Sequence, residues 1–282
     1  MSRDEAVRIA AQEIPGPHGA IPARAYTPVD PAGPGLVWLH GGGFWAGDLD
    51  MPEADWVARS FAARGITVLS VDYRLAPPMA DAAGREGRSG FRHPVPVDDV
   101  VAAFRWATAS GGAAGPWAIG GTSAGGNLAA AATLRLVAEG GIAPALALLA
   151  YPTLLAVQPA PDPELRAALD ADPGADVFGP DAVRALYENY LDAPAEQATS
   201  SAAPGLAVGG ELAGFPPVIM INAEVDELRV SGEAFARTLA EAGVPIDVSI
   251  EPGTTHGYLN RPEEAAASRS IARYAERILA LG

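Results

Sequence analysis

The chain has 282 residues, of which 49% are hydrophobic and 19% are charged, and its formal net charge at pH 7 is -15. This composition provides a sizeable core and excludes a disordered chain, while the acidic balance argues against binding to nucleic acid or to an anionic membrane surface. The sequence contains no Cys and no Lys, which excludes disulfides, thiolate chemistry and a Schiff-base lysine.

Short β-rich runs alternate with longer helical runs, a pattern that predicts a mostly parallel sheet with helices on both faces. The predicted strands cover residues 23–26, 35–40, 66–73, 117–120, 145–151, 218–223 and 246–251. The predicted helices cover residues 54–64, 97–109, 124–139, 181–191, 232–242 and 262–281. The order predicts one α/β domain over residues 1–282.

Two segments interrupt this alternation. Residues 78–92 are rich in Gly, Ala and Arg and predict an irregular loop. Residues 158–215 contain one or two short helical patterns and no convincing strand. Inserted segments of that length are usually functional in a compact domain, so we expect residues 158–215 to form a small helical lid or cap over the site.

The N-terminal segment has acidic residues and no apolar core of the kind that a secretory signal requires. The most apolar stretch, residues 142–157, is interrupted by Pro144 and Pro152 and predicts a buried strand, not a membrane span. We therefore expect a cytoplasmic protein.

Ser123 is the candidate nucleophile. It lies in Gly121-Thr122-Ser123-Ala124-Gly125, which fits the pattern G-x-S-x-G between a predicted strand and a predicted helix. Such a sharp turn exposes the serine hydroxyl, and the helix N-terminus places partial positive charge beside it. The alternative is a nucleotide-binding glycine turn, but its spacing, G-x-G-x-x-G, precedes none of the predicted helices.

A second glycine motif, His40-Gly41-Gly42-Gly43-Phe44, follows the strand predicted at 35–40. Consecutive glycines allow backbone N–H groups to face a small ligand, as stabilisation of an oxyanion requires. A flexible linker is the alternative, but this loop leads into Phe44 and Trp45, which are suited to line an acyl pocket.

His256 is the candidate general base. It follows the strand predicted at 246–251 and precedes the final helix, where a sheet of this type delivers a base. The other histidines lie near the N-terminus, in the glycine loop and at the end of the irregular loop; they are His18, His40 and His93. A structural histidine at the surface is the alternative for position 256.

Asp226 is the leading candidate for the carboxylate that orients this histidine, because it directly follows the strand predicted at 218–223. Such a carboxylate accepts the Nδ1–H of the imidazole and stabilises the imidazolium. Glu224 and Glu227 are close rivals.

Together these motifs resemble the hormone-sensitive-lipase family of bacterial carboxylesterases, bacterial family IV. The resemblance extends from about residue 35 to residue 256. It rests on the two glycine motifs and on the segments Tyr73-Arg74-Leu75-Ala76-Pro77, His93-Pro94-Val95-Pro96, Phe215-Pro216-Pro217, Asp226-Glu227-Leu228-Arg229 and His256-Gly257. It implies an α/β-hydrolase fold, a triad of Ser123, Asp226 and His256, and an oxyanion hole made by the backbone N–H groups of Gly42, Gly43 and Ala124.

Three features depart from the family pattern. Thr122 replaces an Asp that many members have before the nucleophile, which resembles the subgroup with a Gly-Thr-Ser-Ala-Gly motif. Only 39 residues precede His40 in this sequence, so we expect a reduced lid and a more open site. Pro78 stands where a Glu is common.

The expected activity is hydrolysis of small, short-acyl carboxylic esters through an acyl-enzyme, with no metal or organic cofactor required. Candidates for the pocket wall are Phe44, Trp45, Tyr151 and Tyr258, although each is equally compatible with an ordinary core position. An amidase, deacetylase or lactonase using the same triad is the first alternative, and a non-catalytic ligand-binding module is the second. The expected partner is a small-molecule ester; a homodimer is left open.

Overall fold

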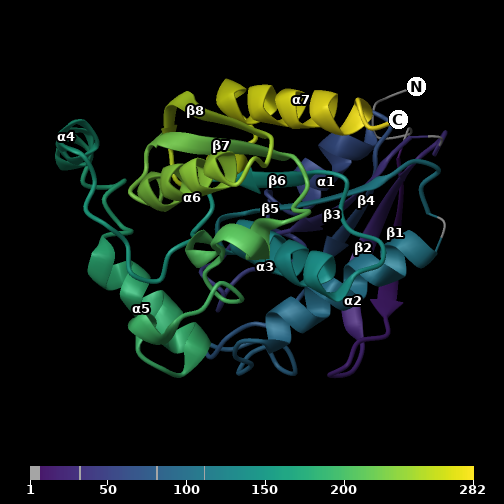
Figure 1. Cartoon of the computed structure of the whole chain (residues 1–282). Helices are drawn as coiled ribbons and strands as arrows, with labels where there is room; N and C mark the ends of the chain where they lie inside the picture. Colours follow the sequence, from purple (N-terminus) through teal and green to yellow (C-terminus); the bar gives the residue numbers. More distant parts are fainter. Residues whose placement is uncertain (1–6, 32, 81, 111) are drawn as a thin grey trace.

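The computed structural model describes residues 7–31, 33–80, 82–110 and 112–282 (Figure 1). The first six residues of the N-terminal segment therefore lie outside the described residues. The described chain contains an eight-stranded sheet in the order β1-β2-β4-β3-β5-β6-β7-β8. The strands are β1 (Val7–Ile14), β2 (Ile21–Pro28), β3 (Gly35–Leu39), β4 (Thr67–Val71), β5 (Trp117–Thr122), β6 (Ala147–Ala150), β7 (Val218–Val225) and β8 (Ile246–Thr255).

The six neighbouring strands β4-β3-β5-β6-β7-β8 are all parallel. β2 runs antiparallel to both of its neighbours, β1 and β4. Leu39, the last residue of β3, pairs with Gly121 near the end of β5. The carboxyl ends of parallel strands share one edge of the sheet. This register therefore brings the glycine loop after β3 next to Ser123 after β5.

Helices cover both faces of the sheet (Figure 1). α1 (Asp55–Ala62) and α7 (Ala265–Leu279) pack with sheet residues such as Trp38 and Leu148 in one buried cluster. α2 (Val95–Ala109), α3 (Ser123–Glu139) and α6 (Arg229–Glu241) pack with Leu39 and Leu149 in the other. Alternate residues of a strand point to opposite faces, which explains why the neighbours Trp38 and Leu39 belong to different clusters.

The chain between β6 and β7 forms α4 (Pro163–Ala171), α5 (Pro180–Leu191) and the short 3-10 helices η2 (Ala195–Gln197), η3 (Pro204–Leu206) and η4 (Gly209–Leu212). α4 and α5 lie beside the sheet, beyond the ends of its strands (Figure 1). Buried Asn127 of α3 connects this segment to the core through two hydrogen bonds. Its Nδ2 donates to the Tyr187 hydroxyl at 2.9 Å and to the Ala202 carbonyl at 3.0 Å.

The predicted α/β architecture, a mostly parallel sheet with helices on both faces, is confirmed. Each predicted strand and helix has a counterpart, with ends that differ by a few residues. The unpredicted β1 is an edge strand whose residues are mostly half-buried or exposed, so its sequence carries only a weak pattern of alternating burial. Among the described residues, no helix has the length and hydropathy needed to cross a membrane.

Candidate active site

Ser123 lies at a strained turn between β5 and α3. Its φ is +50°, a left-handed value that non-glycine residues adopt rarely and mainly where the surrounding structure enforces it. Gly125 makes the turn possible. A Cβ at that position would lie 2.3 Å from the His40 carbonyl oxygen and 2.4 Å from that of Leu39. Only glycine therefore allows α3 to start this close to β3.

A continuous chain of hydrogen bonds connects three side chains from the ends of β5, β8 and β7. Nε2 of His256 lies 3.0 Å from Oγ of Ser123, and Nδ1 of His256 lies 2.7 Å from Oδ2 of Asp226. Asp226 is fully buried, and its Oδ1 accepts the backbone N–H of Leu228 at 3.0 Å. A carboxylate fixed in this way holds the imidazole in the tautomer that presents an unprotonated Nε2 to the hydroxyl.

The two rival carboxylates face other groups. Oε2 of Glu224 accepts the backbone N–H of Gly253 at 2.7 Å. Oε2 of Glu227 lies 3.9 Å from an Arg166 guanidinium nitrogen, and burial raises the pKa of Glu227 above its ordinary value. The structure thus brings Asp226, and neither rival, to the ring of His256.

The glycine loop turns tightly beside Ser123. Gly42 has a φ of +111°, and its carbonyl accepts the N–H groups of Trp45 at 3.2 Å and Ala46 at 2.9 Å. A Cβ on Gly42 would lie 2.1 Å from the Ala46 carbonyl oxygen, so no other residue fits this turn. Gly42 and Gly43 line the same cavity as Ser123.

The remaining expected oxyanion donor, Ala124, is buried at the start of α3. Its N–H belongs to the first turn of that helix, whose N–H groups have no partner within the helix. The helix dipole adds partial positive charge there. The three expected donors therefore come from two segments that meet at Ser123.

His40 organises the glycine loop. Its Nδ1 lies 2.7 Å from the carbonyl oxygen of Gly41, and its ring stacks on Tyr73 with a centroid distance of 4.5 Å. The Tyr73 hydroxyl donates to the His40 carbonyl at 2.8 Å and to the Gly41 carbonyl at 3.3 Å. His40 is fully buried, and burial lowers its pKa below the ordinary value of 6.5.

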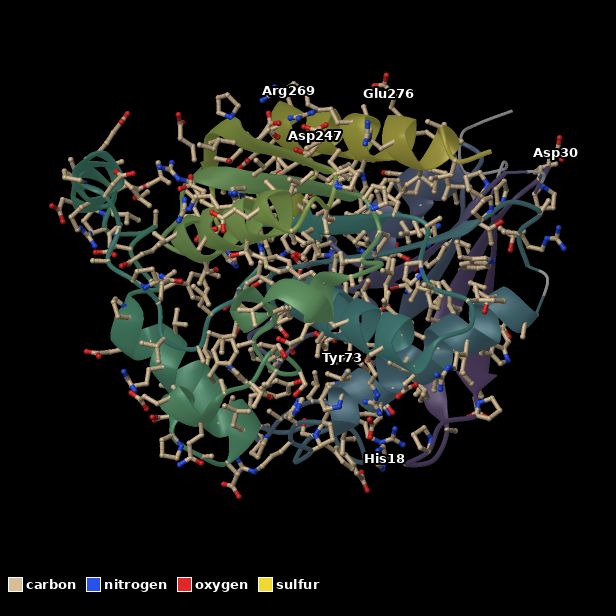
Figure 2. The ribbon with its side chains drawn as sticks, viewed as in Figure 1. His18, Asp30, Tyr73, Asp247, Arg269 and Glu276 are labelled. Carbon is tan, nitrogen blue, oxygen red and sulfur yellow. The ribbon has the colours of Figure 1, made fainter. Side chains whose placement is uncertain are left out.

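The remaining histidines lie elsewhere. His18 is exposed at the edge of the molecule (Figure 2), with Nε2 2.5 Å from Oδ2 of Asp98. Nε2 of His93 lies 3.1 Å from Oγ of Ser201. Neither residue lines the cavity that contains Ser123 and His256.

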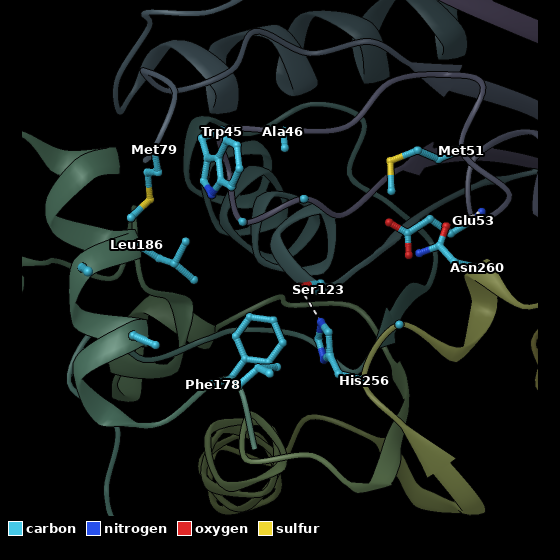
Figure 3. A pocket seen from close by; sticks show the side chains of 16 residues that line it. Trp45, Ala46, Met51, Glu53, Met79, Ser123, Phe178, Leu186, His256 and Asn260 are labelled. Atoms are coloured by element: carbon cyan, nitrogen blue, oxygen red, sulfur yellow. Dashed lines mark hydrogen bonds between the residues drawn. The ribbon is translucent and has the colours of Figure 1, made fainter. Parts of the chain in front are cut away.

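A cavity of about 490 Å³ opens above Ser123 and His256 (Figure 3). Trp45, Met79 and Leu186 lie on one side of Ser123, and Met51, Glu53 and Asn260 lie on the other. The further lining residues are Gly42, Gly43, Ala46, Val177, Phe178, Ala182, Ala185 and Gly257. A volume of this size suits a small organic ligand.

Only Trp45, among the four residues predicted for the pocket wall, lines this cavity. The other three occupy core positions, the alternative that the sequence left open, and do not line the cavity. Phe44 is fully buried and stacks on Tyr190, because a φ of +70° turns its backbone away from the extended course. Tyr151 and Tyr258 are buried and pack edge to face, with ring centroids 5.2 Å apart, and Tyr151 in turn contacts the His256 ring.

Sequence reasoning missed most of the cavity wall. Phe178 and Leu186 belong to the predicted lid, and Phe178 packs over the His256 ring at a centroid distance of 4.4 Å. Met79 belongs to the predicted irregular loop. The lid prediction was the one available signal, since a segment that covers a site supplies side chains to it. Glu53 and Asn260 lie outside every motif identified in the sequence.

Comparison with known proteins places the chain in a family. A family model described as alpha/beta hydrolase fold matches residues 36–260. The carboxylic ester hydrolase LipN of Mycobacterium tuberculosis is 35% identical over 90% of this chain and 65% of its own length. The ethyl acetate hydrolase of Pseudomonas putida is 32% identical over 85% of this chain and 71% of its own length.

A solved structure agrees with these similarities. The hyperthermophilic esterase of the archaeon Pyrobaculum calidifontis superimposes with a TM-score of 0.82 at 30% identity, over 97% of this chain and 83% of that chain. The family predicted from the sequence motifs is thus confirmed, while the Gly-Thr-Ser-Ala-Gly subgroup remains a prediction. The chain belongs to the α/β-hydrolase family, within the part of it that contains the carboxylesterases.

Proposed function

We propose that this chain hydrolyses small carboxylic esters with short acyl groups, through an acyl-enzyme on Ser123. The observation that carries the proposal is the hydrogen-bonded chain from Ser123 Oγ through His256 to Asp226, at 3.0 Å and 2.7 Å, beside the glycine loop. This arrangement of nucleophile, base and orienting carboxylate is the one that acyl transfer to serine requires.

In the first half-reaction, Nε2 of His256 takes the proton of Ser123 as Oγ attacks the carbonyl carbon of the ester. The carbonyl electrons move to oxygen, and the N–H groups of Gly42, Gly43 and Ala124 stabilise the resulting oxyanion. The imidazolium, stabilised by Asp226, then gives its proton to the leaving alcohol. The tetrahedral intermediate collapses to an ester of Ser123.

In the second half-reaction, water replaces the alcohol. His256 takes a proton from the water as its oxygen attacks the acyl carbon, and returns that proton to Oγ of Ser123 when the acid leaves. The first half-reaction thus moves the Ser123 proton to the alcohol, and the second replaces it with a proton from water. The carboxylic acid is released and the enzyme returns to its starting state.

The preference for small substrates rests on the cavity and on one relative. A cavity of about 490 Å³ with Trp45, Phe178 and Leu186 in its wall favours a compact apolar acyl group. The relative named ethyl acetate hydrolase acts, by that name, on a small ester. Residues 158–215 act as the lid in this proposal, because Phe178 and Leu186 come from that segment.

The experiment is a rate comparison on the purified chain. p-Nitrophenyl acetate, butyrate and octanoate are compared with the matched anilides, for the wild type and for Ser123→Ala. We expect the acetate or butyrate ester to be the best substrate, and Ser123→Ala to lose about 10⁴-fold or more in kcat. Ester hydrolysis that survives in Ser123→Ala would disprove the mechanism, and faster anilide cleavage would identify an amidase.

A further inference from the structure

Glu53 is a buried carboxylate in the wall of the cavity to which the steps above assign no role. It is 2% exposed. Its Oε1 accepts the backbone N–H of Gly41 at 2.7 Å, and its Oε2 accepts the hydroxyl of Tyr151 at 3.1 Å. One side chain therefore connects the glycine loop after β3 with the residue that follows β6. Both partners adjoin groups that the proposed reaction uses.

The bond to Gly41 fixes the first of two peptide planes in the glycine loop. The Gly41 N–H belongs to the His40–Gly41 peptide, and Glu53 holds it. The Gly41 carbonyl belongs to the next peptide, and His40 Nδ1 and the Tyr73 hydroxyl hold it at 2.7 Å and 3.3 Å. In a planar trans peptide, C=O and N–H point in opposite directions. The contacts to the Gly41 carbonyl therefore set the direction of the Gly42 N–H, and the Glu53 bond fixes the peptide plane directly before it.

Glu53 also lies close to the nucleophile. A Cβ placed on Gly41 would be 2.7 Å from Oε1 of Glu53 and 3.2 Å from Cβ of Ser123. Gly41 is thus enclosed between the carboxylate and the serine. A loss of the Glu53 contact would free the Gly41 backbone at the point where the loop passes the nucleophile.

The bond to Tyr151 links Glu53 to the general base. The Tyr151 ring packs edge to face against the His256 ring at a centroid distance of 5.0 Å, and the residue has a φ of +36°. A hydroxyl held by a buried acceptor keeps such a ring in one orientation. Through this bond Glu53 supports one side of the imidazole, while Phe178 packs against it at 4.4 Å.

We propose that Glu53 is a positioning residue for catalysis: it orients the glycine loop through Gly41 and supports His256 through Tyr151. The inference rests on the proposed ester hydrolysis and names a further residue of that same site. Glu53 acts as a double hydrogen-bond acceptor, and its negative charge is not needed. A carboxylate charge does not stabilise the developing oxyanion, since like charges repel.

This distinction defines the variants. In Glu53→Gln the amide oxygen accepts the Gly41 N–H, and the amide nitrogen donates to a Tyr151 hydroxyl that has reversed its role. In Glu53→Met the side chain keeps a similar length and fills the space, but offers neither partner a comparable acceptor. The two variants therefore separate lost hydrogen bonds from lost volume.

Two readouts report on the transition state. The first is kcat and KM for the best p-nitrophenyl ester. The second is the affinity for an alkyl trifluoromethyl ketone, to which Ser123 Oγ adds while its proton passes to His256 and the carbonyl electrons move to an oxyanion in the hole. For Glu53→Met we expect kcat and ketone affinity to fall by about 10- to 100-fold, less than the 10²- to 10³-fold effect of deleting a donor. KM stays within about threefold, and Glu53→Gln stays within about threefold of wild type in all three values.

The inference would be overturned by a folded Glu53→Met with wild-type kcat, or by a Glu53→Gln as slow as Glu53→Met. If Glu53→Met does not fold, Tyr151→Phe carries the test. It removes the donor to Oε2, and we expect a kcat loss of about 3- to 10-fold with matching loss of ketone affinity; unchanged values would overturn the inference. The wild-type and Ser123→Ala rates test ester hydrolysis separately. If the wild type is active and the Glu53 and Tyr151 variants are unaffected, only the role proposed for Glu53 is disproved.

Discussion

The ring of Phe44 stacks on the ring of Tyr190, with centroids 4.2 Å apart and planes inclined by 3°. Phe44 ends the glycine loop and Tyr190 belongs to α5, so the stack joins the glycine loop to the segment between β6 and β7 that contributes Phe178 and Leu186 to the cavity wall. Tyr187 adds an edge-to-face contact with Phe44 at 5.3 Å. The glycine loop and α5 are therefore packed against each other.

Phe44→Ala should weaken both stability and turnover. Removing a fully buried Phe leaves a cavity and typically lowers the free energy of unfolding by about 3–5 kcal/mol. Here the loop that carries Gly42 and Gly43 also loses its anchor on α5, so we expect kcat to fall by about 10-fold or more, because misaligned donors stabilise the oxyanion less. Urea denaturation and ester hydrolysis measure the two effects.

Phe235→Ala is the matched control. Phe235 is fully buried in α6 and packs edge to face on Phe215 at 6.2 Å, and it does not line the cavity. It should lose comparable stability and keep its kcat. Equal loss of kcat in the two variants would show that general destabilisation, and not the loop, explains the effect of Phe44→Ala.

Asp226→Asn should reduce kcat by about 10⁴-fold while leaving the fold intact, because an amide that donates to Nδ1 favours the wrong tautomer of His256. Asp226 is buried and accepts the N–H of Leu228, a bond that the amide oxygen can still accept. Stopped assays with p-nitrophenyl acetate measure the rate, and thermal unfolding checks the fold.

Glu224→Gln and Glu227→Gln are the controls, since their carboxylates face Gly253 and Arg166. We expect kcat within about threefold of wild type for both. A variant of either that lost as much activity as Asp226→Asn would move the orienting role away from Asp226.

The sequence was sufficient for the parts of the site that local backbone chemistry dictates. Ser123 needs a glycine at 125 because α3 starts against β3, and the glycine loop needs residues that tolerate positive φ. Such constraints act within a few residues, and for that reason they appear as motifs. The order of the strands then brings the ends of β5, β7 and β8 together.

The cavity wall could not be predicted in this way, because it depends on where side chains point. Phe44 follows the glycines in the sequence, yet it packs on α5 because its own φ is positive. Leu186, in α5, and Phe178 reach the cavity only through the path of the long segment between β6 and β7. Glu53 acts through contacts with residues 12 and 98 positions away. No local pattern encodes such contacts.

Leu186→Ala should shift the preference toward longer acyl chains. Leu186 lines the cavity and lies so close to the glycine loop that a Cβ on Gly43 would be 2.9 Å from its Cδ2. Space for each additional buried CH₂ is worth about 0.8 kcal/mol, or about fourfold in kcat/KM. We therefore expect the octanoate-to-acetate ratio of kcat/KM to rise by about 4- to 16-fold.

Val208→Ala, in the same inserted segment, is the control, because Val208 is 65% exposed and does not line the cavity. Its chain-length profile should match that of the wild type. An unchanged profile in Leu186→Ala would mean that the acyl group lies elsewhere, for example toward Met51 and Asn260.

Acidification should destabilise the fold partly through His40. Burial lowers the pKa of His40 in the folded protein below the 6.5 of an unperturbed histidine, although Gly41 and Asp72 act in the opposite direction. As the pH falls below about 6.5, the unfolded chain binds the proton and the folded chain does not, so stability decreases toward acid. Burial also lowers the pKa of His93, so His93 likewise makes the stability decrease toward acid. His93 is therefore kept in both of the proteins that are compared.

The comparison is the wild type against His40→Asn, whose side-chain amide can still donate to the Gly41 carbonyl but does not titrate. Urea unfolding at pH 7.5 and 5.5 gives the change in the free energy of unfolding for each protein. We expect the wild type to lose about 1 kcal/mol more than the variant over this interval, from the linkage of one proton. Equal losses in the two proteins would mean that His40 accepts its proton as readily in the folded chain as in the unfolded one.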